Sequence, residues 1–129
     1  MAAKPETRLY QRINNKLSIT TTAEKTHNPY RAGIADFYYD TPHGDGWCEY
    51  KYQPTKFKVF TFDEAFEKLL SSNQRRWMKQ RKDNGRRVCI IVGFKDGGIS
   101  IAHPTLSTDR PYTARETAEW IENIWLKWT

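Results

Sequence analysis

The chain has 129 residues, 38% of them hydrophobic and 28% charged, and its formal net charge is +6. This length and composition favour one domain over residues 1–129, while no stretch approaches the ~18 apolar residues of a membrane helix and the start lacks the apolar core of a signal peptide. We therefore expect a cytoplasmic protein (in the host cytoplasm if the chain is viral), and its positive charge favours an anionic partner.

The first half of the chain predicts one helix and three strands. Leu9, Ile13 and Leu17 recur every four residues behind Pro5, which suits a helix start, so a helix is expected over residues 5–17. Runs rich in threonine and in β-branched or aromatic residues predict the strands, and the turn residues between the second and third strand predict a hairpin. The three strands are expected over residues 18–26, 34–40 and 46–52.

The second half predicts helices on either side of two further strands. Sequences that can form a capping box begin at Thr61, Ser71 and Thr113. The segment 62–84 is therefore expected to be two helices or one broken helix, and apolar strands are expected over residues 87–94 and 99–103. The apolar stripe of the final helix consists of Trp120, Ile121, Ile124, Trp125 and Trp128. The order αβββαββα predicts an α/β (α+β) fold with a mixed central β-sheet flanked by helices.

A cluster of cations follows the second capping box. Its members are Arg75, Arg76, Lys79, Arg81, Lys82, Arg86 and Arg87, and Asp83 is the only acid between Gln74 and Arg87. Such a cluster can neutralise several phosphates of a nucleic acid and release their counterions. The alternative is a solvated helix face without a bound partner.

Two acids and a lysine lie in strand-like runs, where such residues are scarce. Glu49 and Lys51 project to one face of their strand, because residues i and i+2 lie about 7 Å apart on the same side, and the predicted hairpin can bring Asp36 beside them. Two carboxylates can hold Mg²⁺ together with the Tyr50 carbonyl, and Lys51 can contact a phosphate during hydrolysis. The alternative for Glu49 and Lys51 is an ion pair on an exposed edge strand.

The motif around these residues resembles the PD-(D/E)xK nuclease superfamily. Gly33-Ile34-Ala35-Asp36 and Glu49-Tyr50-Lys51 are similar to the Gly-x-Pro-Asp and Glu-x-Lys of its VRR-NUC branch, and Leu70-Ser71-Ser72-Asn73-Gln74 is similar to the helix start that follows them. Ala35 departs from the family pattern, which prefers proline at this position. The resemblance to archaeal Holliday-junction resolvases is more distant. The similarity spans residues 6 to about 93, so residues 98–128 form an addition to the shared core.

This resemblance implies a Mg²⁺- or Mn²⁺-dependent DNA endonuclease on a restriction-endonuclease-like core, with branched or single-stranded DNA as candidate substrates. The groups expected around the metal are Glu6, Asp36, Glu49 and the Tyr50 carbonyl, and the catalytic site would be completed by Lys51 and Gln74. The residues expected to bind DNA are Arg31, Arg75, Arg76, Lys79, Arg81 and Lys82. A homodimer is expected by analogy, since a small domain needs a second copy to span a junction.

Several alternatives stay open. Glu6 in the first turn of a helix is also explained by the helix dipole, and Gln74 is also explained by a capping box with Ser71. A protein that binds nucleic acid without cutting it would keep the same fold and cations, and a small interaction protein could use the Trp-rich helix to bind its partner. The nuclease hypothesis requires the two carboxylates and the lysine to converge where solvent reaches them.

Overall fold

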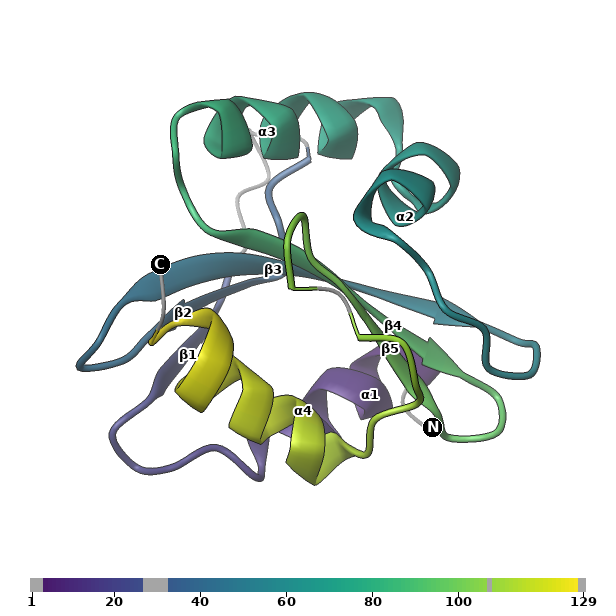
Figure 1. Cartoon of the computed structure of the whole chain (residues 1–129), viewed down its shortest axis with the longest axis horizontal. Helices are drawn as coiled ribbons and strands as arrows, with labels where there is room; N and C mark the ends of the chain where they lie inside the picture. The colour runs from purple at the N-terminus through teal and green to yellow at the C-terminus, as the bar shows by residue number, and fades with distance from the viewer. Residues whose placement is uncertain (1–3, 27–32, 107, 128–129) are drawn as a thin grey trace.

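The computed structural model describes residues 4–26, 33–106 and 108–127 and shows a sheet between two layers of helices (Figure 1). The elements in chain order are α1 (Pro5–Asn14), β1 (Thr22–Lys25), β2 (Phe37–Asp40), β3 (Asp45–Gln53), α2 (Phe62–Leu69), α3 (Ser72–Asp83), β4 (Val88–Phe94), β5 (Ile99–Ala102), α4 (Ala114–Trp120) and the π-helical η1 (Ile121–Trp125). No helix in these ranges is long and apolar enough to cross a membrane.

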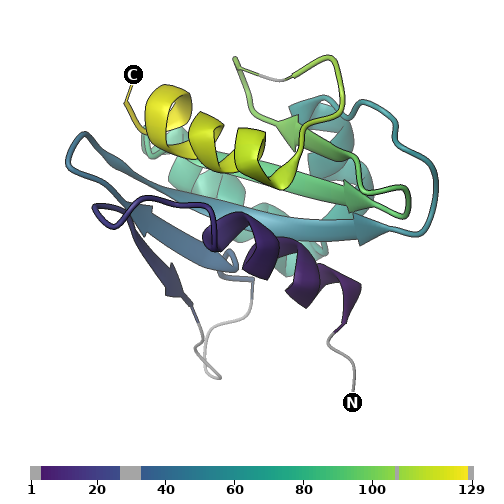
Figure 2. The ribbon, with the colours of Figure 1, turned by 90° about the horizontal axis from the view of Figure 1, so that it is seen from below.

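The strands form one mixed sheet in the order β1-β2-β3-β4-β5. β3 pairs antiparallel with β2 and parallel with β4, and β5 returns antiparallel to β4. β4 is buried along its whole length, as a central apolar strand should be. Helices α2 and α3 cover one face of the sheet, and α1 and α4 cover the other (Figures 1 and 2). The predicted fold class, a mixed sheet flanked by helices, is confirmed.

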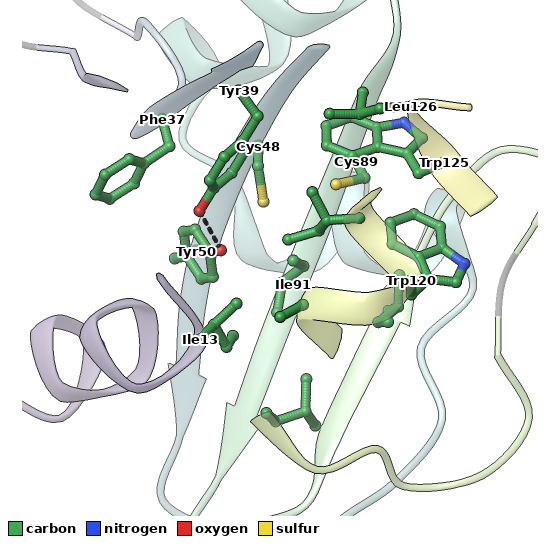
Figure 3. Close-up of a cluster of buried hydrophobic side chains, with 14 of the residues drawn as sticks. Ile13, Phe37, Tyr39, Cys48, Tyr50, Cys89, Ile91, Trp120, Trp125 and Leu126 are labelled. Atoms are coloured by element: carbon green, nitrogen blue, oxygen red, sulfur yellow. Dashed lines mark hydrogen bonds between the residues drawn. The ribbon is translucent and has the colours of Figure 1, made fainter. Parts of the chain in front are cut away.

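The core between the sheet and the helices α1 and α4 is shown in Figure 3. Tyr39 and Tyr50 come from β2 and β3, and their hydroxyl oxygens lie 2.6 Å apart. The Tyr39 hydroxyl also lies 2.6 Å from the side-chain oxygen of Asn14 in α1. These hydrogen bonds satisfy polar groups that would otherwise weaken a buried layer. Because Tyr50 points into this core, Glu49 and Lys51 project to the opposite face, toward α2 and α3.

The Trp-rich terminal helix belongs to the same core. Trp120 and Trp125 stack with 5.6 Å between ring centroids, and both are buried. Ile121 is also buried, whereas Ile124 is 41% exposed, so the predicted apolar stripe is wrong at that position. Trp128 lies outside the described residues. The buried tryptophans cannot serve as an exposed partner-binding surface.

The first helix is shorter than the sequence predicts. A helix was expected over residues 5–17, but α1 ends at Asn14. The Ser18 N–H donates to the Glu122 carboxylate of η1 at 3.0 Å, and the Thr21 hydroxyl donates to the same carboxylate. These contacts fix the turn after α1, and the following strand begins only at Thr22.

The segment 62–84 is two helices, as the first of the two predicted alternatives has it. Leu70 is extended between them, with φ −90° and ψ 144°. Each helix has its own complete capping box, from Thr61 to Glu64 and from Ser71 to Gln74. The observed order is therefore αβββααββα, since the segment that the predicted order αβββαββα counted as one unit is resolved into α2 and α3.

Candidate active site

Strands β2 and β3 stop pairing at the position of the predicted metal site. Their ladder ends at Phe37 and Cys48, whereas β3 continues to Gln53. Just beyond the last pair, the Asp36 carboxylate accepts a hydrogen bond from the Tyr50 N–H at 2.9 Å. In a strand, the N–H and the C=O of one residue point to the same side. The Tyr50 carbonyl therefore also faces Asp36, as the predicted metal site requires.

A close backbone contact holds Asp36 beside the start of α3. Gly33 has a φ of +88°, and a Cβ atom placed on it would lie 2.3 Å from the Asn73 carbonyl oxygen. Both features require glycine. On the other side of this segment, the Thr26 N–H donates to the Asp36 carbonyl at 2.9 Å, and the Thr26 hydroxyl donates to the Ala35 carbonyl. The glycine of the motif thus lets the acid-bearing segment pack against α3.

Gln74 connects the start of α3 to β3. Its side-chain oxygen accepts from the Ser71 N–H at 2.9 Å, which closes the capping box, and from Lys51 Nζ at 3.0 Å. Its side-chain nitrogen donates to Glu49 Oε2 at 3.5 Å. Capping and contact with the site are therefore combined in one side chain.

Glu49 is the buried member of the group, with 2% of its surface exposed. Burial, followed by the hydrogen bond and the negative charge of Asp36, raises the pKa of Glu49 to about 10, although Lys51 opposes this shift. Near neutral pH, the Glu49 carboxyl is therefore protonated unless another cation enters. The alternative of an exposed ion pair on an edge strand is wrong, because β3 is a central strand and Glu49 is buried.

Solvent reaches the site through its other groups. The Asp36 side chain is 22% exposed, and Lys51 is half-buried. The nuclease hypothesis requires a site that solvent reaches, and Asp36 and Lys51 meet this requirement whereas Glu49 does not. Lys25 Nζ of β1 lies 4.0 Å from Asp36 Oδ1, so Lys25 is a further cation at the site that sequence reasoning missed.

Glu6 approaches the site from α1. It is half-buried, and burial, followed by the charge of Asp36, raises its pKa, while Lys51 and Lys25 oppose the shift. The described residues nevertheless contain no group of three acidic, histidine or cysteine side chains close enough to hold a metal ion. A cation would therefore depend on Asp36, Glu49, the Tyr50 carbonyl and water. This all-oxygen donor set fits Mg²⁺, which is bound through one or two carboxylates and keeps several of its waters.

The predicted DNA-binding cations lie along α3. Three of them are engaged within the structure: Arg75 donates to the Leu70 carbonyl at 2.7 Å, Lys79 pairs with Asp83 at 2.6 Å, and Arg81 lies 4.6 Å from the Trp77 ring centroid. Arg76 and Lys82 are exposed. Arg31 lies outside the described residues. The cations that remain most accessible to a phosphate backbone are thus Arg76 and Lys82.

No known family model matches the sequence, and neither does any curated protein. Among solved structures, the chain is similar to the 1.6 Å structure of Hjc, a Holliday junction resolvase from the archaeal hyperthermophile Archaeoglobus fulgidus. The two chains are 12% identical, the alignment covers 84% of this chain and 81% of that chain, and the TM-score is 0.49. This similarity is too low to transfer the activity of that protein to this chain.

Proposed function

We propose that this protein is a metal-dependent endodeoxyribonuclease that hydrolyses phosphodiester bonds of DNA. The observation that supports it best is the meeting of two carboxyl groups, Asp36 and Glu49, with Lys51 on the same side of the sheet. Glu49 is buried beside the negative charge of Asp36, and a buried carboxyl group can carry its own charge only with a compensating partner. The same pair is a favourable place for a divalent cation.

The residues that would hold Mg²⁺ or Mn²⁺ are Asp36, Glu49 and the Tyr50 carbonyl. When bound, such an ion polarises a phosphoryl oxygen and lowers the pKa of its bound water. Because carboxylate ligands must be deprotonated, Glu49 would have to release its proton to solvent in order to hold such an ion. The burial of Glu49 keeps competing water away from its ligand oxygen.

Lys51 would stabilise the negative charge that develops on the phosphate. An ammonium group has three donors, so the hydrogen bond from Lys51 to Gln74 leaves donors for a phosphate oxygen. Gln74 acts here as a positioning residue, because its own oxygen is held by the Ser71 N–H. The start of α3 thereby fixes where the lysine points.

The test is a cleavage assay on labelled duplex, single-stranded, flap and four-way-junction DNA, with Mg²⁺, Mn²⁺ or EDTA. Asp36→Asn and Glu49→Gln should each lower the rate by about 100-fold or more, the size expected when one stabilising group is lost from an active site. Asp40→Asn is the matched control, because Asp40 is an exposed acid at the far end of β2. Wild-type rates in both site variants, with thermal melts that show folded protein, would refute the proposal.

A second candidate function is nucleic-acid binding without cleavage. It is favoured by the 2% exposure of Glu49 and by the lack of a three-carboxylate group among the described residues. The exposed cations Arg76 and Lys82 would then provide the affinity. Salt-dependent binding without cleavage of any of the four DNA structures, in either metal, would establish this alternative.

A further inference from the structure

A pocket of about 700 Å³ lies at the end of the sheet where β3 and β4 begin. It is lined by the start of β3 with Trp47, the connection from α3 to β4 with Arg86, the loop after β5 with His103, and Trp125 of η1. Its volume is that of a small-ligand pocket, which is roughly 300–1,000 Å³. The candidate catalytic residues do not line it, so it is a separate feature of the molecule.

Two indole rings contribute to the lining of this pocket, Trp47 from the α2 and α3 face of the sheet and Trp125, which is 1% exposed, from the α1 and α4 face. The Trp47 ring packs against Tyr38 at 4.8 Å and edge-on against Trp77 at 5.0 Å between centroids. The Trp125 ring stacks on Trp120. These contacts fix both rings before a ligand arrives. The Trp47 ring, which is only partly buried, suits a planar nucleobase, since every base has a face that can stack.

Cations outnumber acids around the pocket. Lys82, Arg86 and Arg87 line it, and Asp45 is the only acid among its lining residues, all of which are described. The Asp45 carboxylate already accepts a hydrogen bond from the Tyr38 hydroxyl. Lys82 and Arg86 are exposed. The balance of charge therefore favours an anion, and arginine and lysine are the side chains that bind phosphate.

The remaining wall is a fixed loop. His103 Nδ1 accepts from the Thr105 N–H at 3.1 Å and from the Leu106 N–H at 3.0 Å. Leu106 is 37% exposed and adds apolar surface.

We propose that this pocket binds a single nucleotide, with its base against Trp47 and Leu106 and its phosphate at Lys82 and Arg86. We infer that the nucleotide is an unpaired one of the DNA substrate, which rests on the proposed nuclease function. Trp47 lies two residues before Glu49 on the same face of β3, a separation of about 7 Å. The bond to be cut would then lie close to the unpaired nucleotide.

Binding in EDTA tests this proposal without cleavage. The probes are a duplex with one unpaired adenosine, the same duplex with an abasic residue at that position, and free deoxyadenosine 5′-monophosphate. Wild-type protein should bind the unpaired adenosine about tenfold more tightly than the abasic site, as expected for one stacked base. Leu106→Glu, which places a negative charge beside the base, should bring the ratio of the two affinities close to one. Leu106→Gln, which adds no charge, should retain most of the tenfold difference.

The phosphate contact is tested with Lys82→Ala/Arg86→Ala, which should weaken binding of both bulged duplexes. The matched control is Lys16→Ala/Lys68→Ala, which removes the same charge from exposed positions outside the pocket and should weaken binding less. Equal weakening by the two double variants would overturn the phosphate contact.

The nucleotide source is decided by the free mononucleotide. One result would assign the pocket to a free nucleotide instead of to DNA. In that case deoxyadenosine 5′-monophosphate binds tightly, Leu106→Glu abolishes this binding, and the two bulged duplexes bind equally well. If wild-type protein binds the two bulged duplexes with equal affinity and does not bind the mononucleotide, the proposal is overturned entirely. Because none of these binding measurements involves cleavage, a negative result would leave the nuclease proposal standing. Conversely, a protein that cleaves no DNA but still binds the unpaired adenosine more tightly than the abasic site would overturn the nuclease proposal and keep the pocket.

Discussion

Replacing Glu49 by glutamine should remove much of the pH sensitivity of the metal-free protein. Burial and the neighbouring Asp36 raise the pKa of Glu49 to about 10 in the folded protein, from an ordinary value of 4.5. Between these two values the folded protein keeps a proton that the unfolded chain has released, so the free energy of unfolding falls as the pH rises. The stabilising contribution of the protonated carboxyl is complete below the ordinary pKa and is lost as the pH passes through about 10.

The expected magnitude follows from this proton. One proton changes the free energy of unfolding by about 1.4 kcal/mol per pH unit. From about pH 5.5 to about pH 8, wild-type protein should therefore lose up to about 3 kcal/mol relative to Glu49→Gln. Urea unfolding in EDTA at both pH values measures the difference. Groups that titrate in both proteins cancel in the difference between their free energies of unfolding. His103 is one of these groups, and burial lowers its pKa to about 4.

Parallel pH dependences of the two proteins would refute this reasoning, because Glu49 would then not be held protonated in the fold. The same samples test the cation. At about pH 8 and 100 times its dissociation constant, Mg²⁺ should stabilise wild-type protein by about 2.7 kcal/mol, and it should stabilise Glu49→Gln clearly less. Equal stabilisation would mean that the ion binds at another place.

The remaining predictions concern the fold around the site. Gly33→Ala should lower the free energy of unfolding by about 2 kcal/mol or more, because a Cβ atom would collide with the Asn73 carbonyl at a φ of +88°; a urea midpoint equal to that of wild type would contradict this. Ser71→Ala should lower the free energy of unfolding by about 1 kcal/mol and keep cleavage. Gln74→Ala should also lower kcat by about tenfold or more, because Lys51 would lose the group that positions it. Equal kcat values in the two variants would rule out a site role for Gln74. Trp125→Ala should cost about 3–5 kcal/mol, and an unchanged thermal midpoint would exclude Trp125 from the core.

The sequence predicted the fold well where the signal is local. All three capping boxes form as predicted, because each needs only four consecutive residues. The prediction failed where a distant residue decides the structure. The end of α1 is the clearest case, since Ser18 is bound by Glu122, 104 positions away. No periodicity in the first helix could reveal that contact.

The same distinction applies to the candidate site. Glu49 and Lys51 share a face because the side-chain period of a strand is two, and this could be predicted from spacing alone. The place of Lys25 beside Asp36 depends on the register of β1 against β2, which a short, largely exposed edge strand does not specify. The burial of Glu49 depends on how α3 packs over the sheet, and the raised pKa that follows from it was equally hidden in the sequence.

Stability and site geometry are coupled at the first turn of α3. The Gln74 oxygen that closes the capping box also holds Lys51, and the neighbouring Asn73 carbonyl is in contact with Gly33, which begins the segment that carries Asp36. The lysine and the acid are therefore positioned by the same turn of helix. A loss of this turn would displace both groups together, so substitutions here should act non-additively on cleavage, as groups that share partners do. Independent structural acids and lysines on a sheet would not show such coupling.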